Sequence, residues 1–459
     1  MEESATSFTR RRALAAAGVA LVAGCVGDDS GNDDTDGSTD TGDTDVGEVV
    51  ADEYDHPTPT DDPDWRPAEG SPLDVDIETE VLVENLEIPW DITFTGNGEL
   101  FMTERTGNVL RFDAGEVSAV ASPADAIDAG AVEPGTDERP WWVEGGEGGT
   151  LGIAAHPEYP DESYIYVYYT AGNGEATENR VVRYDVEASD PAETEEVILD
   201  GIPAANIHNG GRIAFGPDDN LWVCTGDAGE EALARDLDSL AGKVLRVSSD
   251  GDPLSTNPDL GGDPRIFTYG HRNPQGIDWL PDGVPVVTDH GPVARDEVHV
   301  LRVGGDYGWN EVRGGPGDSE WEAYADHEEF VPPVVNTGPG TTWAPTGATF
   351  YDGDTIPVWR NRYVVSGLIS QSIYVVTLTP PGIEPPPTDG DEAELYDDDW
   401  LDDAYTASAH RVLEDELGRV RHVGRSPGGE LYALTSNRDG RAEGAFPRTS
   451  DDVLVRLTT

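Results

Sequence analysis

The chain has 459 residues, with 92 Asp and Glu against 28 Lys and Arg and a formal net charge of −64. So negative a field repels nucleic acid and anionic surfaces, which excludes both as partners. The 11 Trp and 16 Tyr residues exclude a wholly disordered acidic protein, because they supply apolar surface for a core. Lys243 is the single lysine. An acidic, lysine-poor surface suits a halophilic protein, since concentrated salt screens its self-repulsion.

The N-terminus carries an export signal. Residues Thr9–Leu14 contain three consecutive arginines in a twin-arginine pattern, and the apolar stretch 13–24 that follows is too short for a permanent membrane span. That stretch ends in Val22–Cys25, the pattern of a lipobox. We therefore expect residues 1–25 to direct export by the twin-arginine route. Lipidated Cys25 would then anchor a secreted protein on the outer face of the cytoplasmic membrane, with no other membrane contact.

Residues 26–72 are rich in Asp, Gly, Thr and Ser and contain almost nothing apolar. Such a composition buries too little surface to offset the conformational entropy lost on folding. This segment is predicted to be a disordered acidic linker between the anchor and the folded domain.

From residue 73 to 459 one β-type unit recurs. It consists of an apolar strand, a Gly/Asp/Asn turn, a second apolar strand, and a third strand that contains arginine. Its copies begin at Ile92, Leu151, Arg212, Gly276, Gly347 and Arg421. A mean spacing of roughly 60 residues predicts an all-β, six-bladed β-propeller, because a solenoid would need shorter and more regular periods.

Two further elements complete the prediction. The strand-like segment 76–82 precedes the first copy and could complete the last blade, which would close the ring and remove its edges. Residues 231–240 form a weak helical pattern. Cys224 lies in a strand-like run, so it is predicted to be buried and inert.

Five stretches of the repeating region carry distinctive motifs, and a sixth lies near the C-terminus. They are Pro89–Ile92 with Thr103–Arg105, Gly146–Gly152 with His156–Pro157, His208–Arg212 with Gly216–Asp218, Gly270–Gly276, Gly304–Trp309, and Gly418–Arg421. In this order they resemble the soluble glucose/aldose (sorbosone-type) dehydrogenases that use pyrroloquinoline quinone (PQQ). Together with the leader, the chain resembles a haloarchaeal secreted lipoprotein of that family. The resemblance implies oxidation of aldose sugars to lactones with PQQ and calcium, and transfer of electrons to an acceptor at the cell surface.

His208 is the candidate catalytic base. It lies in a loop ahead of a strand, and an imidazole with a pKa near neutrality can accept the proton of a sugar hydroxyl while hydride leaves the same carbon. The family's histidine in this motif has that role, which the resemblance implies for His208.

Four further residues are implied to hold the cofactor. A guanidinium is permanently charged and suits a quinone oxygen that becomes negative on reduction, and the resemblance implies this role for Arg272 beside Asn273. Arg419 and Arg421 alternate along a strand, so their side chains share one face, and they match family arginines that bind the cofactor's carboxylates. Glu147 matches a polar residue at the sugar end of the pocket.

Calcium requires oxygen ligands. The segment Asp289–Pro292 resembles the family loop in which the Gly and Pro carbonyls, here of Gly291 and Pro292, hold the calcium that bridges to the cofactor. Glu297, through its side chain, and Tyr307, through its carbonyl, match a second, structural calcium site.

One departure leaves other functions open. Some family members place a lysine against the cofactor, where this chain has Ile369 or Ser370, and Lys243 lies in a strand that looks structural. A propeller that binds carbohydrate or a partner without catalysis is therefore an alternative, and a calcium-dependent lactonase is another. The lactonase would require a central cluster of carboxylates.

Overall fold

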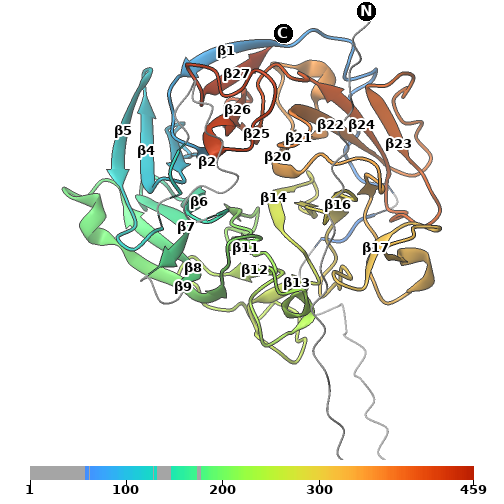
Figure 1. Cartoon of the computed structure of the whole chain (residues 1–459), viewed down its shortest axis with the longest axis horizontal. Helices are drawn as coiled ribbons and strands as arrows, with labels where there is room; N and C mark the ends of the chain where they lie inside the picture. The colour runs from blue at the N-terminus through green and yellow to red at the C-terminus, as the bar shows by residue number, and fades with distance from the viewer. Residues whose placement is uncertain (1–56, 61, 128, 132–145, 173–176) are drawn as a thin grey trace, which may run out of the picture. The chain divides into compact units, whose positions relative to one another are not determined.

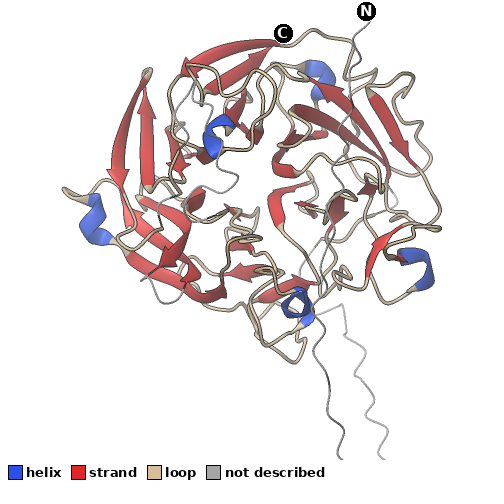
Figure 2. Ribbon diagram, in the orientation of Figure 1, coloured by secondary structure: helices blue, strands red, loops and turns tan. Residues whose placement is uncertain are grey.

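The computed structural model describes residues 57–60, 62–127, 129–131, 146–172 and 177–459. Six antiparallel sheets of four or five strands surround a central axis (Figure 1). Helical structure in the described ranges is limited to short 3₁₀ turns (Figure 2). The predicted all-β, six-bladed propeller is therefore confirmed.

Each of the first four blades begins with its innermost strand. The first two blades are β2 (Pro89–Phe94), β3 (Leu100–Glu104), β4 (Asn108–Asp113) and β5 (Glu116–Ala121), then β6 (Thr150–Ala155), β7 (Tyr164–Gly172), β8 (Thr177–Asp185) and β9 (Glu196–Pro203). The next two are β10 (Ile213–Phe215), β11 (Leu221–Cys224), β12 (Lys243–Val247) and β13 (Ile266–Tyr269), then β14 (Pro274–Trp279), β15 (Pro285–Asp289), β16 (Glu297–Val300) and β19 (Val335–Asn336).

The last two blades are less regular. The fifth has five strands, β20 (Pro345–Tyr351), β21 (Arg362–Gly367), β22 (Ser372–Thr379), β24 (Thr406–Val412) and β23 (Ala393–Tyr396), and the sixth has β25 (Val420–Arg425), β26 (Leu431–Thr435), β27 (Leu454–Thr458) and β1 (Glu78–Val83). A parallel pair, β17 (Val312–Gly314) and β18 (Glu322–Ala323), is inserted in the chain between β16 and β19 of the fourth blade. The 3₁₀ turns are η2 (Pro191–Thr194), η3 (Glu231–Arg235), η4 (Tyr324–Asp326), η5 (Pro357–Trp359) and η6 (Asn437–Asp439).

The ring closes through strands from the two ends of the domain. β1 runs antiparallel to β27, with Glu78 opposite Thr458 and Val81 opposite Val455. The pairing confirms that the segment near residues 76–82 completes the last blade.

The core lies between neighbouring blades. Trp222 of the third blade contacts Phe267 edge-on at 4.6 Å and Trp279 of the fourth blade at 5.8 Å. Cys224 packs in the same cluster and is fully buried. Burial raises the pKa of its thiol to about 12, so it is inert at neutral pH, as predicted.

The predicted disordered linker is too long at its C-terminal end. Trp65 is buried and packs against Phe350 at 5.4 Å and Tyr405 at 5.8 Å. The indole of Trp359 donates a hydrogen bond to the carbonyl of Pro72 at 3.0 Å. The buried indole of Trp65 and hydrogen bonds to the backbone, including those from Arg362 to the carbonyls of Ala68 and Gly70 at 2.8 and 2.7 Å, hold residues 62–72 on the propeller despite their acidic composition. Residues 1–56, including Cys25, lie outside the described residues.

The helical pattern at 231–240 forms only the short turn η3, followed by irregular chain. Lys243 lies beneath this turn, fully buried. Its Nζ donates to the carbonyls of Leu233, Ala234 and Ala241 at 2.8, 2.9 and 2.6 Å. This lysine therefore has a structural role, as its strand context indicated. None of the helices in the described ranges is long and apolar enough to cross a membrane.

Candidate active site

The topology brings one set of loops to one end of the central channel. Because neighbouring strands in a blade are antiparallel, the start of the innermost strand and the end of the second strand lie at the same edge of the sheet. A cavity of about 640 Å³ lies where these loops converge. Its lining includes eight of the ten predicted site residues of the propeller, namely Glu147, His208, Arg272, Asn273, Gly291, Pro292, Arg419 and Arg421.

His208 is held by a buried carboxylate. Its Nδ1 lies 2.6 Å from Oδ1 of Asp227, which is itself fully buried. The other carboxylate oxygen of Asp227 accepts a hydrogen bond from the indole of Trp309 at 2.7 Å. Because a carboxylate only accepts, Nδ1 of His208 carries the proton and Nε2 is left as the basic atom. This is the arrangement of a general base with an orienting partner.

The His208 loop depends on glycine and on an unusual backbone conformation. His208 has a φ of 57°, in the left-handed region that side-chain-bearing residues rarely adopt. A Cβ at Gly226 would lie 2.0 Å from the His208 carbonyl oxygen. Only glycine allows the two loops to approach so closely, and this approach places Asp227 beside the imidazole.

Glu147 supports the same loop. Its Oε2 accepts the backbone N–H of His208 at 2.8 Å, and its Oε1 pairs with Arg441 at 3.1 Å. Burial works against the charged form of Glu147, but Arg441 and the His208 amide outweigh it and lower the pKa to about 2. The predicted substrate residue therefore lines the cavity, with both its oxygens bound to the protein.

Arg272 and Asn273 form another part of the cavity wall. Both backbone N–H groups donate to the buried carboxylate of Asp289, at 3.0 and 2.7 Å. The Arg272 guanidinium lies 5.3 Å from the centroid of the Trp309 ring, and its Nη1 donates to the carbonyl of His290 at 3.3 Å. The predicted pair is thus fixed by its backbone, with the guanidinium in the cavity wall.

A group of guanidinium side chains lines the cavity at the sixth blade. Arg419 is paired with Asp439, from Nη2 to Oδ2 at 2.8 Å. Among the residues that the structure describes, Arg421 donates only to the neutral Gln275, at 3.0 Å. Burial and the neighbouring guanidinium groups lower the pKa of Arg421 well below its usual value, although Asp439 opposes them. Buried cations that repel one another are stabilised by an anion, so this wall is suited to a ligand with carboxylates.

The loop after β15 presents backbone oxygens to the same cavity. The N–H of Gly291 donates to Asp296 at 2.8 Å. Within the described part of the chain, no hydrogen bond ends on the carbonyl of Gly291 or Pro292. Two unbonded carbonyls near the carboxylate of Asp296 offer the oxygen donors that calcium prefers.

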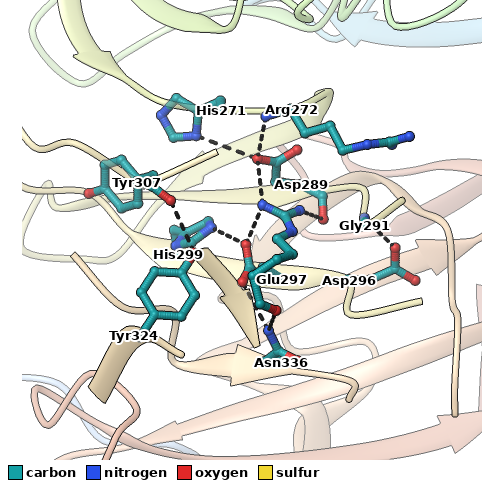
Figure 3. A network of polar contacts seen from close by, with 12 residues as sticks. His271, Arg272, Asp289, Gly291, Asp296, Glu297, His299, Tyr307, Tyr324 and Asn336 are labelled. Carbon is teal, nitrogen blue, oxygen red and sulfur yellow. Dashed lines mark hydrogen bonds and ion pairs between the residues drawn. The ribbon is translucent and has the colours of Figure 1, made fainter. Parts of the chain in front are cut away.

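Glu297 and Tyr307 do not line the cavity. They belong to a buried network behind Asp289 (Figure 3), in which Glu297 pairs with Arg313 at 2.5 Å and accepts from Asn336 at 2.9 Å. The carbonyl of Tyr307 accepts the hydroxyl of Tyr324 at 3.0 Å. The atoms predicted to bind a second calcium therefore have partners from the chain itself.

The family follows from comparison with known proteins. The family model for Glucose / Sorbosone dehydrogenase matches residues 86–445. The chain therefore belongs to the glucose/sorbosone dehydrogenase family.

Its relatives include sugar dehydrogenases. It is 25% identical over 385 residues to an aldose sugar dehydrogenase of Escherichia coli, covering 81% of this chain and 93% of that protein. Quinoprotein glucose dehydrogenase B of Acinetobacter calcoaceticus is 29% identical over 280 residues, covering 54% of this chain and 55% of that protein. The PQQ-bound aldose sugar dehydrogenase of Streptomyces coelicolor superposes with a TM-score of 0.64 at 28% identity, covering 86% of this chain and 99% of the other.

Sequence reasoning missed several residues of the site. Asp227, Asp439 and Arg441 were not predicted, although each follows the second strand of a blade. Their position just after a second strand could have identified them. Such a residue lies at the same edge of the sheet as the loop before the innermost strand. Glycine patterns in the loops before the innermost strands drew attention to Glu147, His208 and Arg272 instead.

Proposed function

We propose that this protein is a PQQ- and calcium-dependent aldose dehydrogenase that oxidises sugars to lactones. The observation that carries the proposal is the pair of His208 and Asp227, with a basic nitrogen beside a cavity lined by arginine. The reaction needs a base for the sugar hydroxyl and a site for an anionic cofactor, and this cavity offers both.

The cavity wall fits PQQ, which carries three carboxylates. Arg421 Nε and Arg272 Nε are buried without a hydrogen-bond partner among the described residues, so each has a donor available to a ligand. Arg419 and Arg421 would hold the carboxylates of the cofactor, and Arg272 with Asn273 its quinone end. When bound, PQQ would accept the hydride of the sugar, which carries both electrons of the oxidation.

Positive charge reaches the cavity without the lysine that some family members carry. Ile369 is 59% exposed and lies at the cavity edge in its place. Arg105 and Arg441 also line the cavity, so positive charge reaches it from the first and sixth blades. This favours the dehydrogenase over a propeller that has lost its cofactor.

His208 would remove the proton of the anomeric hydroxyl through Nε2. Asp227 would keep the proton on Nδ1 and stabilise the imidazolium that forms. Glu147 would hold the loop in place through the His208 N–H. Gly291 and Pro292 would offer carbonyl oxygens to calcium at the same cavity.

Reconstitution in concentrated salt tests the proposal. Purified protein is mixed with PQQ and calcium, and quinone absorbance and sugar-dependent dye reduction are recorded. We expect both signals, and we expect EDTA to abolish dye reduction. Bound quinone without dye reduction would indicate a non-catalytic binding protein, and lactone hydrolysis without PQQ would indicate a lactonase.

We also propose that the protein works on the outer face of the cytoplasmic membrane, exported by the twin-arginine route and anchored through Cys25. The leader motifs support this location. An external site would place the cavity where free sugars and a membrane-associated electron acceptor are available.

A further inference from the structure

A buried polar network lies behind the active-site loop, on the strands of the fourth blade. Asp289, Glu297, His299 and Arg313 are all fully buried. Asp289 ends β15, and Glu297 and His299 stand two residues apart on β16, so their side chains share one face of the sheet (Figure 3). None of them lines the cavity of the candidate active site.

Three of these side chains have the spacing of a metal site. One ligand atom each from Asp289, Glu297 and His299 lies within 4.8 Å of the others. Two carboxylates, buried side by side, require a positive charge, because an isolated buried carboxylate is strongly destabilised. The network therefore needs either a metal ion or a cationic side chain.

The guanidinium of Arg313 stands at that position. Its Nη1 lies 2.5 Å from Oε2 of Glu297 and 3.5 Å from Oδ2 of Asp289. Calcium binds oxygen at about 2.3–2.6 Å, so an ion bound to this oxygen of Glu297 would compete with Nη1 for the same space. His299 Nε2 lies 3.1 Å from the same oxygen, which leaves little room for a second cation.

The remaining acceptors of the network are also bound. Oε1 of Glu297 accepts from Asn336 at 2.9 Å, and the carbonyl of Tyr307 accepts from Tyr324 at 3.0 Å. The donor set therefore does not fit calcium while Arg313 keeps this position.

We propose that the guanidinium of Arg313 is a built-in cation that takes the place of a structural calcium ion between Asp289 and Glu297. An arginine remains charged at all relevant pH values and cannot dissociate or be chelated. The fourth blade of this chain is thereby independent of metal at this position. Calcium, if the protein binds it, is confined to the cavity side of Asp289.

The same side chain connects this network to the active-site loop. Arg313 Nη2 donates to the carbonyl of His290 at 2.9 Å, and Asp289 accepts the N–H groups of Arg272 and Asn273. A fixed internal cation keeps Asp289 charged, so the backbone of the loop is held without a bound ion.

The number of calcium ions bound per chain tests the proposal. Equilibrium dialysis in concentrated salt, without PQQ, compares the parent with Arg313→Ala and Arg313→Lys. The control is Arg360→Ala, which removes an exposed arginine that is paired with Asp354. We expect Arg313→Ala to bind one calcium ion more than the parent, and its melting temperature to rise with calcium by several degrees more. Arg313→Lys and Arg360→Ala should match the parent, because both retain a cation in the network.

Glu297→Gln in the parent background should leave the number of bound calcium ions unchanged, and should remove the additional ion from Arg313→Ala. Loss of one ion from the parent on this substitution would overturn the proposal. A folded Arg313→Ala chain without an additional ion would overturn it as well. If that variant does not fold, a crystal of the parent grown with calcium decides: the guanidinium between the carboxylates supports the proposal, and a metal ion bonded to Glu297 refutes it.

Discussion

Nδ1 of His208 lies 2.6 Å from Oδ1 of Asp227, on loops from the start of β10 and the end of β11 in one blade. The contact fixes the tautomer of the imidazole, because the carboxylate can only accept. The carboxylate is itself held in place, since Trp309 and Gly229 donate to it at 2.7 and 2.8 Å. The proposed base is therefore oriented before any substrate binds.

Replacing the base should remove turnover and spare the cofactor. His208→Gln retains a polar side chain but cannot accept a proton, so turnover should fall by about 10²- to 10⁴-fold. Quinone absorbance of the reconstituted protein should persist. The control is His327→Gln, because His327 pairs with Glu322 and Glu329 outside the cavity. Dye reduction by His208→Gln at the parental rate would contradict the assignment.

Asp227→Asn should lower turnover almost as much as His208→Gln, although the amide is nearly isosteric with the carboxylate. An amide has one oxygen, whereas His208 and Trp309 each donate to a different oxygen of this carboxylate. If the amide nitrogen faces His208, it donates to Nδ1 and moves the proton to Nε2, which abolishes the base. We expect turnover to fall on the order of 10²-fold or more with KM little changed. A shift in KM alone would mean that Asp227 serves sugar binding instead.

The pH dependence of stability should report on Glu147. Its pKa in the folded protein is about 2, below the ordinary 4.5, so the folded state favours the charged form. The stabilisation is fully present above pH 4.5 and is lost as the pH falls towards 2. The denaturation midpoint of the parent should therefore exceed that of Glu147→Gln at neutral pH, and the two should converge across this window. Parallel curves would show that the Glu147–Arg441 pair adds no stability.

Salt should stabilise the whole propeller. Raising the ionic strength from about 0.1 M to about 1 M shortens the Debye length from ~10 Å to ~3 Å and screens repulsion between carboxylates. The formal charge of −64 makes this repulsion large, so the melting temperature should rise steeply with KCl. A protein of near-zero net charge in the same buffers serves as the control. A flat response would show that the acidic surface is not an adaptation to salt.

The location can be tested through its proposed anchor. Cys25→Ser should release the mature protein into the medium, because the hydroxyl cannot accept the lipid of a lipobox cysteine. Immunoblots of membrane and medium fractions would measure the shift. Cys224→Ser is the matched control, since Cys224 lies in the core and its loss should leave the location unchanged. Retention of Cys25→Ser in the envelope would argue against the lipobox.

The sequence predicted the fold well because each blade repeats local rules. An apolar strand, a tight turn and a second strand are encoded within about 20 residues, and the copies at Ile92 and Gly347 correspond to β2 and β20. The glycine-rich motifs around His208 and Arg272 could also be recognised from neighbouring residues in the sequence. The linker prediction was wrong at residues 62–72 because the average composition of a segment does not reveal one buried side chain, here that of Trp65.

Partners from distant blades could not be predicted in the same way. Glu147 and Arg441 are 294 residues apart, and only closure of the ring brings them together. The role of Arg313 was invisible for a similar reason. Its strand, β17, lies outside the repeating blades, and no local pattern indicates that its side chain reaches Glu297.

The pairing of β1 with β27 also bears on how the protein is made. β27 pairs with β1, so a strand from the end of the propeller domain must meet a strand synthesised near the start of the domain. Until then the sixth blade lacks two strands, and the loop after β26, which carries Asp439 and Arg441, has no closed ring to hold it. The arginine-lined wall of the cavity is therefore assembled only after β27 has been synthesised. A prematurely terminated chain would lack not only an edge strand but also a functional pocket.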